Sequence, residues 1–197
     1  MNIYFLRHGQ TSENTKSVYY GSLDVNLNEK GIQQIKKAAK FFKNIKIDKV
    51  YISDRKRTFQ TASIIIGNKK DIPIIVDNRL NETNFGDFEG KNYDELVKLY
   101  PEECKKWIED WKTFRPVNGE TFIEMYTRTS GFMDDIKNSK DENILVVTHS
   151  GVIRAALCYV MDANMDLFWK FGCINGDRVT IKYEYENFYI DSITHCD

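Results

Sequence analysis

The stretch Leu6-Arg7-His8-Gly9-Gln10-Thr11 determines how the rest of this chain is organised. It follows the apolar run Ile3-Tyr4-Phe5, which predicts a short buried strand. Gly9 lets the backbone turn sharply and come close to a ligand. Arg7 offers a planar, permanently charged fork that matches phosphate oxygens, and His8 offers a nitrogen nucleophile. The stretch therefore predicts phosphate chemistry at the end of a buried strand.

Short apolar runs alternate with helical patterns along the remaining chain. Further strands are predicted at 48–52, 72–76 and 143–148, and helices at 29–42, 53–66, 93–99, 101–111, 122–136 and 151–161. Residues 179–190 alternate between apolar and polar around Glu186-Asn187, which is typical of an antiparallel hairpin. We expect an α/β fold, a three-layer α/β/α sandwich with a mostly parallel sheet and a C-terminal antiparallel hairpin. We further expect one domain over 1–197, with a helical cap-like insertion at about 91–140.

Three local expectations concern the helices. Ser53 or Asp54 is expected to cap the helix that follows, with Phe59 on or near its buried face. Trp107 and Trp111 are four residues apart and are expected to lie one turn apart on a single helix. The apolar stripe of the helix over 122–136 is interpreted as core packing and not as a ligand groove.

Composition and charge exclude several classes of protein. The formal charge of −1 argues against a nucleic-acid partner, which would require a basic surface. The four cysteines form no CxxC pair, so neither a zinc site nor a disulfide framework is expected. No apolar run approaches the roughly 18 residues of a membrane span, and nothing at the amino terminus predicts a signal peptide. We expect a cytoplasmic protein without a membrane partner.

Polar side chains follow three of the predicted strands. Arg7 and His8 follow the first, Ser53 leads into the helix turn that carries Arg57, and Thr148-His149-Ser150-Gly151 follows a central strand. Because ligands bind beyond the carboxyl ends of parallel strands, these groups are expected to meet around one anion. The third histidine of the chain, His195, is interpreted as an ordinary hydrogen-bonded residue.

Such a set of residues suits the transfer of a phosphoryl group. Two arginines can neutralise the dianion, and their charge should lower the pKa of His8 so that its imidazole stays neutral and nucleophilic. His149 can stabilise charge on the phosphoryl oxygens. The leaving alcohol also needs an acid, for which the long loop at 77–92 offers Glu82, with Asp87 and Glu89 as alternatives. A solvated, non-catalytic Glu82 is an equally good interpretation on physical grounds alone.

The motifs taken together resemble the signature of the histidine phosphatase superfamily, the phosphoglycerate-mutase-like phosphatases. The resemblance spans nearly the whole chain and rests on Arg7-His8-Gly9, Ser53…Arg57…Thr61-Ala62, Leu80…Glu82…Phe85-Gly86…Glu89-Gly90 and Val147-Thr148-His149-Ser150-Gly151. It implies catalytic roles for His8, Glu82, His149, Arg7 and Arg57, and substrate binding by Arg7, Asn14, Gly21, Arg57, His149 and Ser150. It implies a phosphohistidine intermediate and no metal or cofactor. One departure is Asp54-Arg55, where the family commonly has a proline or small residue and then an apolar one.

The resemblance also favours one branch of the family. Mutases have an arginine and a tyrosine after the catalytic glutamate, where this chain has Thr83 and Phe85, so a hydrolase of a small phosphorylated metabolite is expected. The short form is similar to α-ribazole-5′-phosphate phosphatases of cobalamin biosynthesis. A broad-specificity or sugar-phosphate phosphatase and a phosphoglycerate mutase remain alternatives, and a homodimer is left open. A non-catalytic phosphate-binding module should have lost His8, Arg57 or Glu82, and a nucleotide-binding protein would need a GxGxxG loop.

Overall fold

The computed structural model describes residues 1–69 and 71–196. The strands are β1 (Asn2–Arg7), β2 (Lys49–Ile52), β3 (Ile74–Val76), β4 (Asn143–Thr148), β5 (Arg178–Glu184) and β6 (Asn187–Thr194). The α-helices are α1 (Ser12–Thr15), α2 (Glu29–Phe42), α3 (Lys56–Ile66), α4 (Tyr93–Leu99), α5 (Pro101–Glu109), α6 (Phe122–Ile136) and α7 (Ser150–Val160). Three 3₁₀ helices complete the set: η1 (Asn78–Leu80), η2 (Gly86–Phe88) and η3 (Met165–Lys170).

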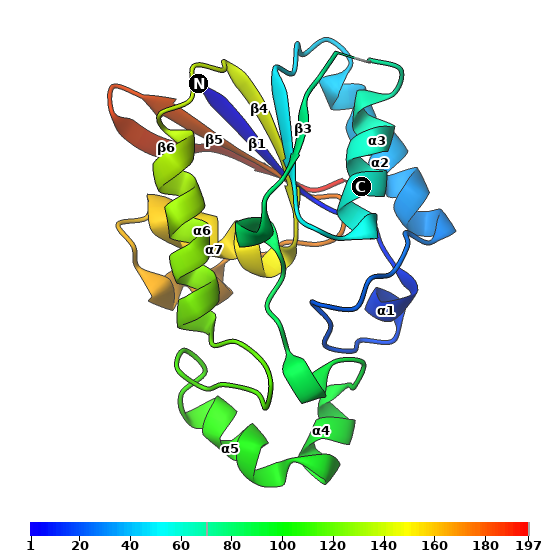
Figure 1. Cartoon of the computed structure of the whole chain (residues 1–197), viewed down its shortest axis with the longest axis vertical. Helices are drawn as coiled ribbons and strands as arrows, with labels where there is room; N and C mark the ends of the chain where they lie inside the picture. Colours follow the sequence, from blue (N-terminus) through cyan, green and yellow to red (C-terminus); the bar gives the residue numbers. More distant parts are fainter. Residues whose placement is uncertain (70, 197) are drawn as a thin grey trace.

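The six strands form one sheet in the order β3-β2-β4-β1-β5-β6 (Figure 1). β3, β2, β4 and β1 pair in parallel, whereas β5 pairs antiparallel with both β1 and β6. The predicted fold class is therefore confirmed, including the antiparallel hairpin at the end of the chain. The first strand of the sequence lies in the interior of the sheet and directly beside β4. This pairing places the two strand ends that carry histidines next to each other.

Alternation along β1 creates the two faces of the sheet. Ile3 and Phe5 belong to an apolar core that includes buried residues of α6 and α7. Tyr4 and Leu6 point the other way, into a second core that includes buried residues of α2 and α3. Because side chains alternate between the two faces of a strand, one buried strand serves both cores. The outcome is the three-layer arrangement that the sequence predicts.

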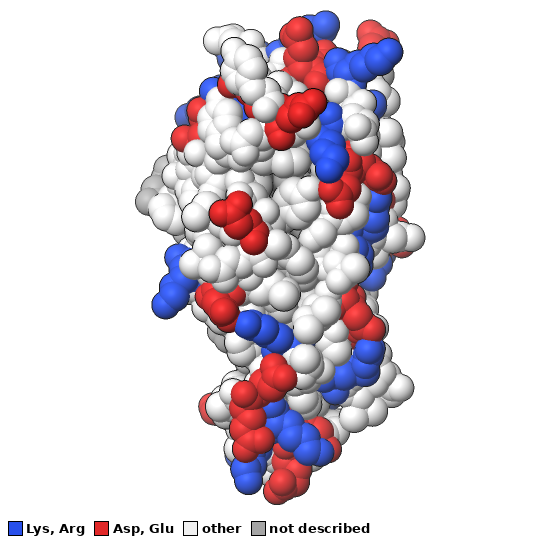
Figure 2. All heavy atoms as spheres, turned by 90° about the vertical axis from the view of Figure 1, so that its left-hand side faces the viewer, with Lys and Arg blue, Asp and Glu red and all other residues white. Residues whose placement is uncertain are grey.

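The helices α4 and α5 lie at the end of the molecule far from the β5–β6 hairpin (Figure 1). They form a third, smaller core around Phe88, Leu96 and Cys104. On the face seen in Figure 2, Lys and Arg side chains alternate with Asp and Glu among the described residues, and neither sign gathers into a large patch. None of the described helices is long and apolar enough to cross a membrane.

Both expectations for the helix α3 are wrong. The N-cap residue of α3 is Arg55, and the Ser53 hydroxyl contacts the side chains of His149 and Thr58 instead of a backbone N–H of the helix. Phe59 is 53 % exposed, because the polar Thr58 and Thr61 occupy the buried face of α3 and satisfy their hydroxyls on backbone oxygens.

The two tryptophans do not share a helix. α5 ends at Glu109, so Trp111 lies beyond it and packs on Phe122 and Phe168, whereas Trp107 packs in the small core of α4 and α5. The helix stripe at 122–136 belongs to the core, as expected, but Phe122 and Met125 at its start also line a cavity, which the interpretation as core packing alone did not include.

Candidate active site

The ends of β1 and β4 bring the two histidines together. Arg7 lies beside Thr148 in the parallel register, so His8 and His149 leave the sheet at the same level. Their rings lie edge to face with centroids 5.0 Å apart, and both side chains are buried. The two histidines therefore share one site, as the sequence predicts.

His8 is held in a defined tautomer. Its Nδ1 lies 2.8 Å from the carbonyl oxygen of Gly9, which can only accept a hydrogen bond, so Nδ1 carries the proton. The lone pair is therefore on Nε2. Burial and, secondarily, the charges of Arg57 and Arg7 hold the pKa of His8 well below its usual range. The imidazole is neutral at neutral pH and has an unprotonated nitrogen.

His149 is fixed at both ring nitrogens. Nδ1 lies 3.4 Å from Nε of Arg57, which is only a donor, so Nδ1 accepts and Nε2–H donates to the Ser53 hydroxyl at 2.8 Å. Burial is again the main cause that lowers the pKa of His149, and Arg57 and His8 add to it. Ser53, which the sequence suggested as a helix cap, instead orients this ring.

Arg57 is fully buried behind His149. Its two terminal nitrogens donate to the carbonyl oxygens of Leu23 and Gly21 at 2.7 and 2.8 Å, and the guanidinium lies over the ring of Tyr20. Gly21, predicted to bind substrate, has both backbone groups occupied, because its N–H donates to Glu89. The structure thus brings Arg57 to the histidines and Gly21 to Arg57.

Arg7 and Asn14 reach the same place from β1 and α1. Arg7 donates through one terminal nitrogen to the carbonyl oxygen of Cys173 at 2.6 Å, and its Nε is buried without a partner in the described part of the chain. The side-chain oxygen of Asn14 accepts from the Thr11 N–H and from the amide of Asn175. Asn175 also donates to the carbonyl oxygen of His8, so it links the residues at 8 and 14.

Glu82 contacts the first turn of α7. One of its oxygens accepts from the Gly151 N–H at 3.1 Å, and the other accepts from the Thr83 N–H at 3.0 Å. The two alternatives from the sequence are engaged elsewhere. Glu89 accepts four backbone N–H groups, three of them from residues 21–23, and Asp87 accepts from the side chain of Asn118. Of the three carboxyls, Glu82 lines a cavity together with both histidines.

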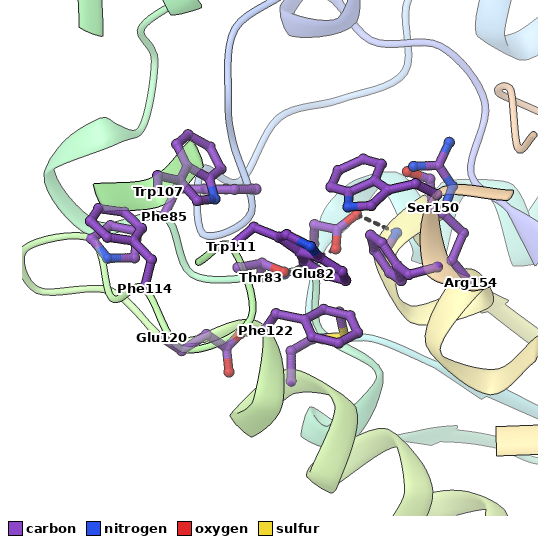
Figure 3. Close-up of a pocket in the computed structure, with 15 residues that line it drawn as sticks. Glu82, Thr83, Phe85, Trp107, Trp111, Phe114, Glu120, Phe122, Ser150 and Arg154 are labelled. Atoms are coloured by element: carbon purple, nitrogen blue, oxygen red, sulfur yellow. Dashed lines mark hydrogen bonds between the residues drawn. The ribbon is translucent and has the colours of Figure 1, made fainter. Parts of the chain in front are cut away.

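Two cavities meet at Glu82. The smaller one, of about 160 Å³, is lined by Arg7, His8, Asn14, Val18, Tyr19, Tyr20, Glu82, Phe85, His149 and Ser150. About half of the residues that line the larger one, of about 230 Å³, are aromatic: Phe85, Trp107, Trp111, Phe114, Phe122, Phe168 and Trp169. Both are lined by Glu82, Phe85 and Ser150. Figure 3 shows Glu82 with Trp107 and Phe114 on one side and Ser150 and Arg154 of α7 on the other.

Sequence reasoning missed three groups of this site. Tyr20 and Asn175 lie in segments without a strand-end or motif signal, and only the fold brings them to His8. Arg154 lies one turn after Ser150 on α7, a spacing that could have placed it on the same helix face. Among the described residues no group of three or more His, Cys, Asp or Glu side chains is arranged to hold a metal ion.

The chain has many relatives of known fold. A model of the histidine phosphatase superfamily (branch 1) matches residues 3–195. An adenosylcobalamin/α-ribazole phosphatase of Salmonella typhimurium is 30 % identical over 89 % of this chain and 87 % of the relative, and phosphoserine phosphatase 1 of Hydrogenobacter thermophilus is 30 % identical over 93 % and 87 %. The crystal structure of a putative α-ribazole-5′-P phosphatase from Escherichia coli has a TM-score of 0.94 at 25 % identity and covers 100 % of this chain and 97 % of its own.

Proposed function

The chain belongs to the histidine phosphatase superfamily and is a phosphoric monoester hydrolase, and we propose that it acts through a phosphohistidine on His8. Nε2 of His8 attacks phosphorus, the N–P bond forms, and the P–O bond to the leaving alcohol breaks. Water then attacks the phosphohistidine, the N–P bond breaks, and inorganic phosphate leaves. The tautomer and the lowered pKa of His8 support this role, because they leave Nε2 unprotonated at neutral pH.

The smaller cavity is proposed to hold the phosphoryl group. Arg7 contributes a guanidinium to its wall, Asn14 contributes an amide, and the N-terminal end of α7 at Ser150 favours an anion through the helix dipole. His149 also lines it. Arg57 does not line the cavity; it places its charge behind His149 and keeps that ring oriented. We propose that the positive charge of Arg57 stabilises the phosphoryl dianion from behind His149, while its guanidinium keeps its hydrogen bonds to the carbonyl oxygens of Gly21 and Leu23.

Glu82 is proposed as the general acid and base. It lies where the phosphate cavity and the aromatic cavity meet, which is where the oxygen between phosphorus and the leaving group must lie. Its carboxyl donates a proton to the departing alkoxide in the first step and accepts one from the attacking water in the second. This shared position is the observation that carries the proposal, because it places an acid between a phosphate site and a leaving-group site.

We propose α-ribazole 5′-phosphate, an intermediate of cobalamin biosynthesis, as the substrate. Its benzimidazole is a planar aromatic group, and the larger cavity presents aromatic side chains to whatever leaves the phosphorus. The names of the Salmonella relative and of the E. coli structure support the same substrate. A broad-specificity phosphatase is the second candidate, since an apolar wall can accept many aryl groups.

The test is a steady-state comparison in the presence of EDTA. Purified protein and His8→Ala are each assayed with α-ribazole 5′-phosphate, 3-phosphoglycerate, phosphoserine and phenyl phosphate, with buffer without enzyme as the blank. We expect the highest kcat/KM for α-ribazole 5′-phosphate and no turnover by His8→Ala. Equal values for α-ribazole 5′-phosphate and phenyl phosphate would favour the broad-specificity enzyme, and turnover by His8→Ala would remove the covalent mechanism.

A further inference from the structure

The aromatic cavity contains one charged group that the proposed mechanism does not use. Arg154 lines it from α7, four residues after Ser150 and therefore on the same face of the helix. Its guanidinium carbon lies 5.5 Å from the ring centre of Trp169 and 5.7 Å from that of Phe168. Arg154 thus lines the cavity together with Glu82 and Ser150, all three of which are labelled in Figure 3.

This guanidinium has no acceptor in the described part of the chain. Its Nε is buried without a hydrogen-bond partner, and no carboxylate there pairs with it. The other charged residues of the cavity differ. Glu120 pairs with Arg128 at 2.6 Å, and Glu82 accepts two backbone N–H groups. The two terminal nitrogens of Arg154 also have no hydrogen bond to the described residues but are not covered, so they can donate to an acceptor on a ligand in the cavity.

We infer that Arg154 is a specificity-determining residue for the leaving group, an inference that rests on the proposed phosphatase activity. The preferred leaving group is a planar aromatic alcohol or nucleoside-like alcohol that carries a carboxylate or a ring-nitrogen acceptor away from the phosphate. The rings bind its faces, and Arg154 donates to the acceptor. The unsubstituted ring nitrogen of the benzimidazole in α-ribazole belongs to this class.

The test compares two synthetic substrates of similar shape. 4-Carboxyphenyl phosphate presents an acceptor, and 4-methylphenyl phosphate does not. The measured quantity is the ratio of their kcat/KM values in the wild type and in Arg154→Met, which keeps an unbranched apolar stem. Differences in intrinsic reactivity cancel between the two proteins, and both rates come from one preparation, so the ratio does not depend on the fraction that is folded.

We expect the ratio to fall at least tenfold in Arg154→Met, which corresponds to about 1.4 kcal/mol. The ratio in Arg154→Lys should lie between those of the wild type and Arg154→Met, because lysine keeps the charge but lacks the planar guanidinium.

The matched control is Arg178→Met. Arg178 also has a buried Nε without a partner among the described residues, and its guanidinium lies over Phe41, but it lines neither the phosphate cavity nor the aromatic cavity. Its ratio should equal that of the wild type. An unchanged ratio in Arg154→Met would overturn the role of Arg154 and leave the phosphatase intact. A wild type that hydrolyses neither aryl phosphate would overturn the proposed function, and this inference with it.

Discussion

Replacing Gly151 by alanine should disable the acid while it leaves the fold in place. A Cβ at this position would lie 2.3 Å from Oε1 of Glu82, and real Cβ contacts are essentially never shorter than 3.0 Å. The atom in the way is the end of a flexible side chain, so the carboxyl can withdraw without moving the backbone. It has to move by about 1 Å, and a misplacement of that size can cost roughly 100-fold in rate.

Two substrates whose leaving groups differ in their need for a proton can test whether the acid is what is lost. An alkyl phosphate needs a proton on its leaving oxygen, whereas 4-nitrophenolate leaves without one. We expect Gly151→Ala to lower kcat/KM by about 100-fold for an alkyl phosphate and much less for 4-nitrophenyl phosphate, because kcat/KM reports the first step, in which only the alkyl leaving group needs a proton. The control is Gly131→Ala on α6, where an added Cβ meets nothing within 4 Å and both rates should be kept. Equal losses for the two substrates in Gly151→Ala would refute the assignment of Glu82 as the acid.

Four further predictions follow from the same geometry. Arg57→Lys keeps the charge, but its single amine nitrogen cannot make the three hydrogen bonds that the guanidinium donates. We expect kcat to fall by about 100-fold or more, and an unchanged kcat would show that Arg57 does not contribute to the active site. Glu82→Gln should lower kcat/KM for alkyl phosphates about 100-fold and for 4-nitrophenyl phosphate much less; an unchanged kcat/KM for alkyl phosphates would point to another acid. Burial lowers the pKa of His8 and His149, so below pH about 6.5 the unfolded chain binds protons that the folded chain does not. The free energy of unfolding, measured in urea titrations, should therefore fall by about 1 kcal/mol per histidine between pH 6 and pH 5. A free energy of unfolding that does not change over this range would contradict two neutral buried histidines. Arg128→Met should lower kcat about tenfold, because Arg128 donates to the Glu82 carbonyl oxygen and pairs with Glu120, and an unchanged kcat would show that this support is dispensable.

Strand ends were predictable because their signals are local. The apolar runs that became β1 and β4 each precede a histidine, and the right-handed rules of parallel sheets bring such ends to one edge. The fold class, the family and the enzyme class are confirmed. The roles of His8, Glu82, His149, Arg7, Arg57, Asn14, Gly21 and Ser150 stay predictions, although the structure brings all of them to one region.

The errors have a common physical cause. Phe59 was expected to be buried because it is apolar, but α3 buries Thr58 and Thr61 instead. Their hydroxyls contact the Ser53 hydroxyl and the Gly9 N–H, next to the histidines. Ser53 was expected to cap a helix because serine does so in isolation, but His149, distant in sequence, offers it a better partner at 2.8 Å. A single sequence gives residue types and spacing, whereas these choices depend on which segments meet after folding.

The connection between Glu82 and the phosphate cavity also depends on segments that meet only after folding. Glu89 accepts N–H groups of Gly21 and of Phe85, so it ties the loop at 21–23 to the loop that carries Glu82. Gly21 lies so close to the carbonyl oxygen of Thr83 that a Cβ there would be only 1.8 Å away. The same Gly21 accepts from Arg57, which in turn holds His149. A shift of the loop that carries Glu82 would therefore disturb Arg57 behind the histidines. Gly21 and the partly buried carboxylate of Glu89 join the proton donor to the charges of the phosphate cavity and keep their geometry fixed.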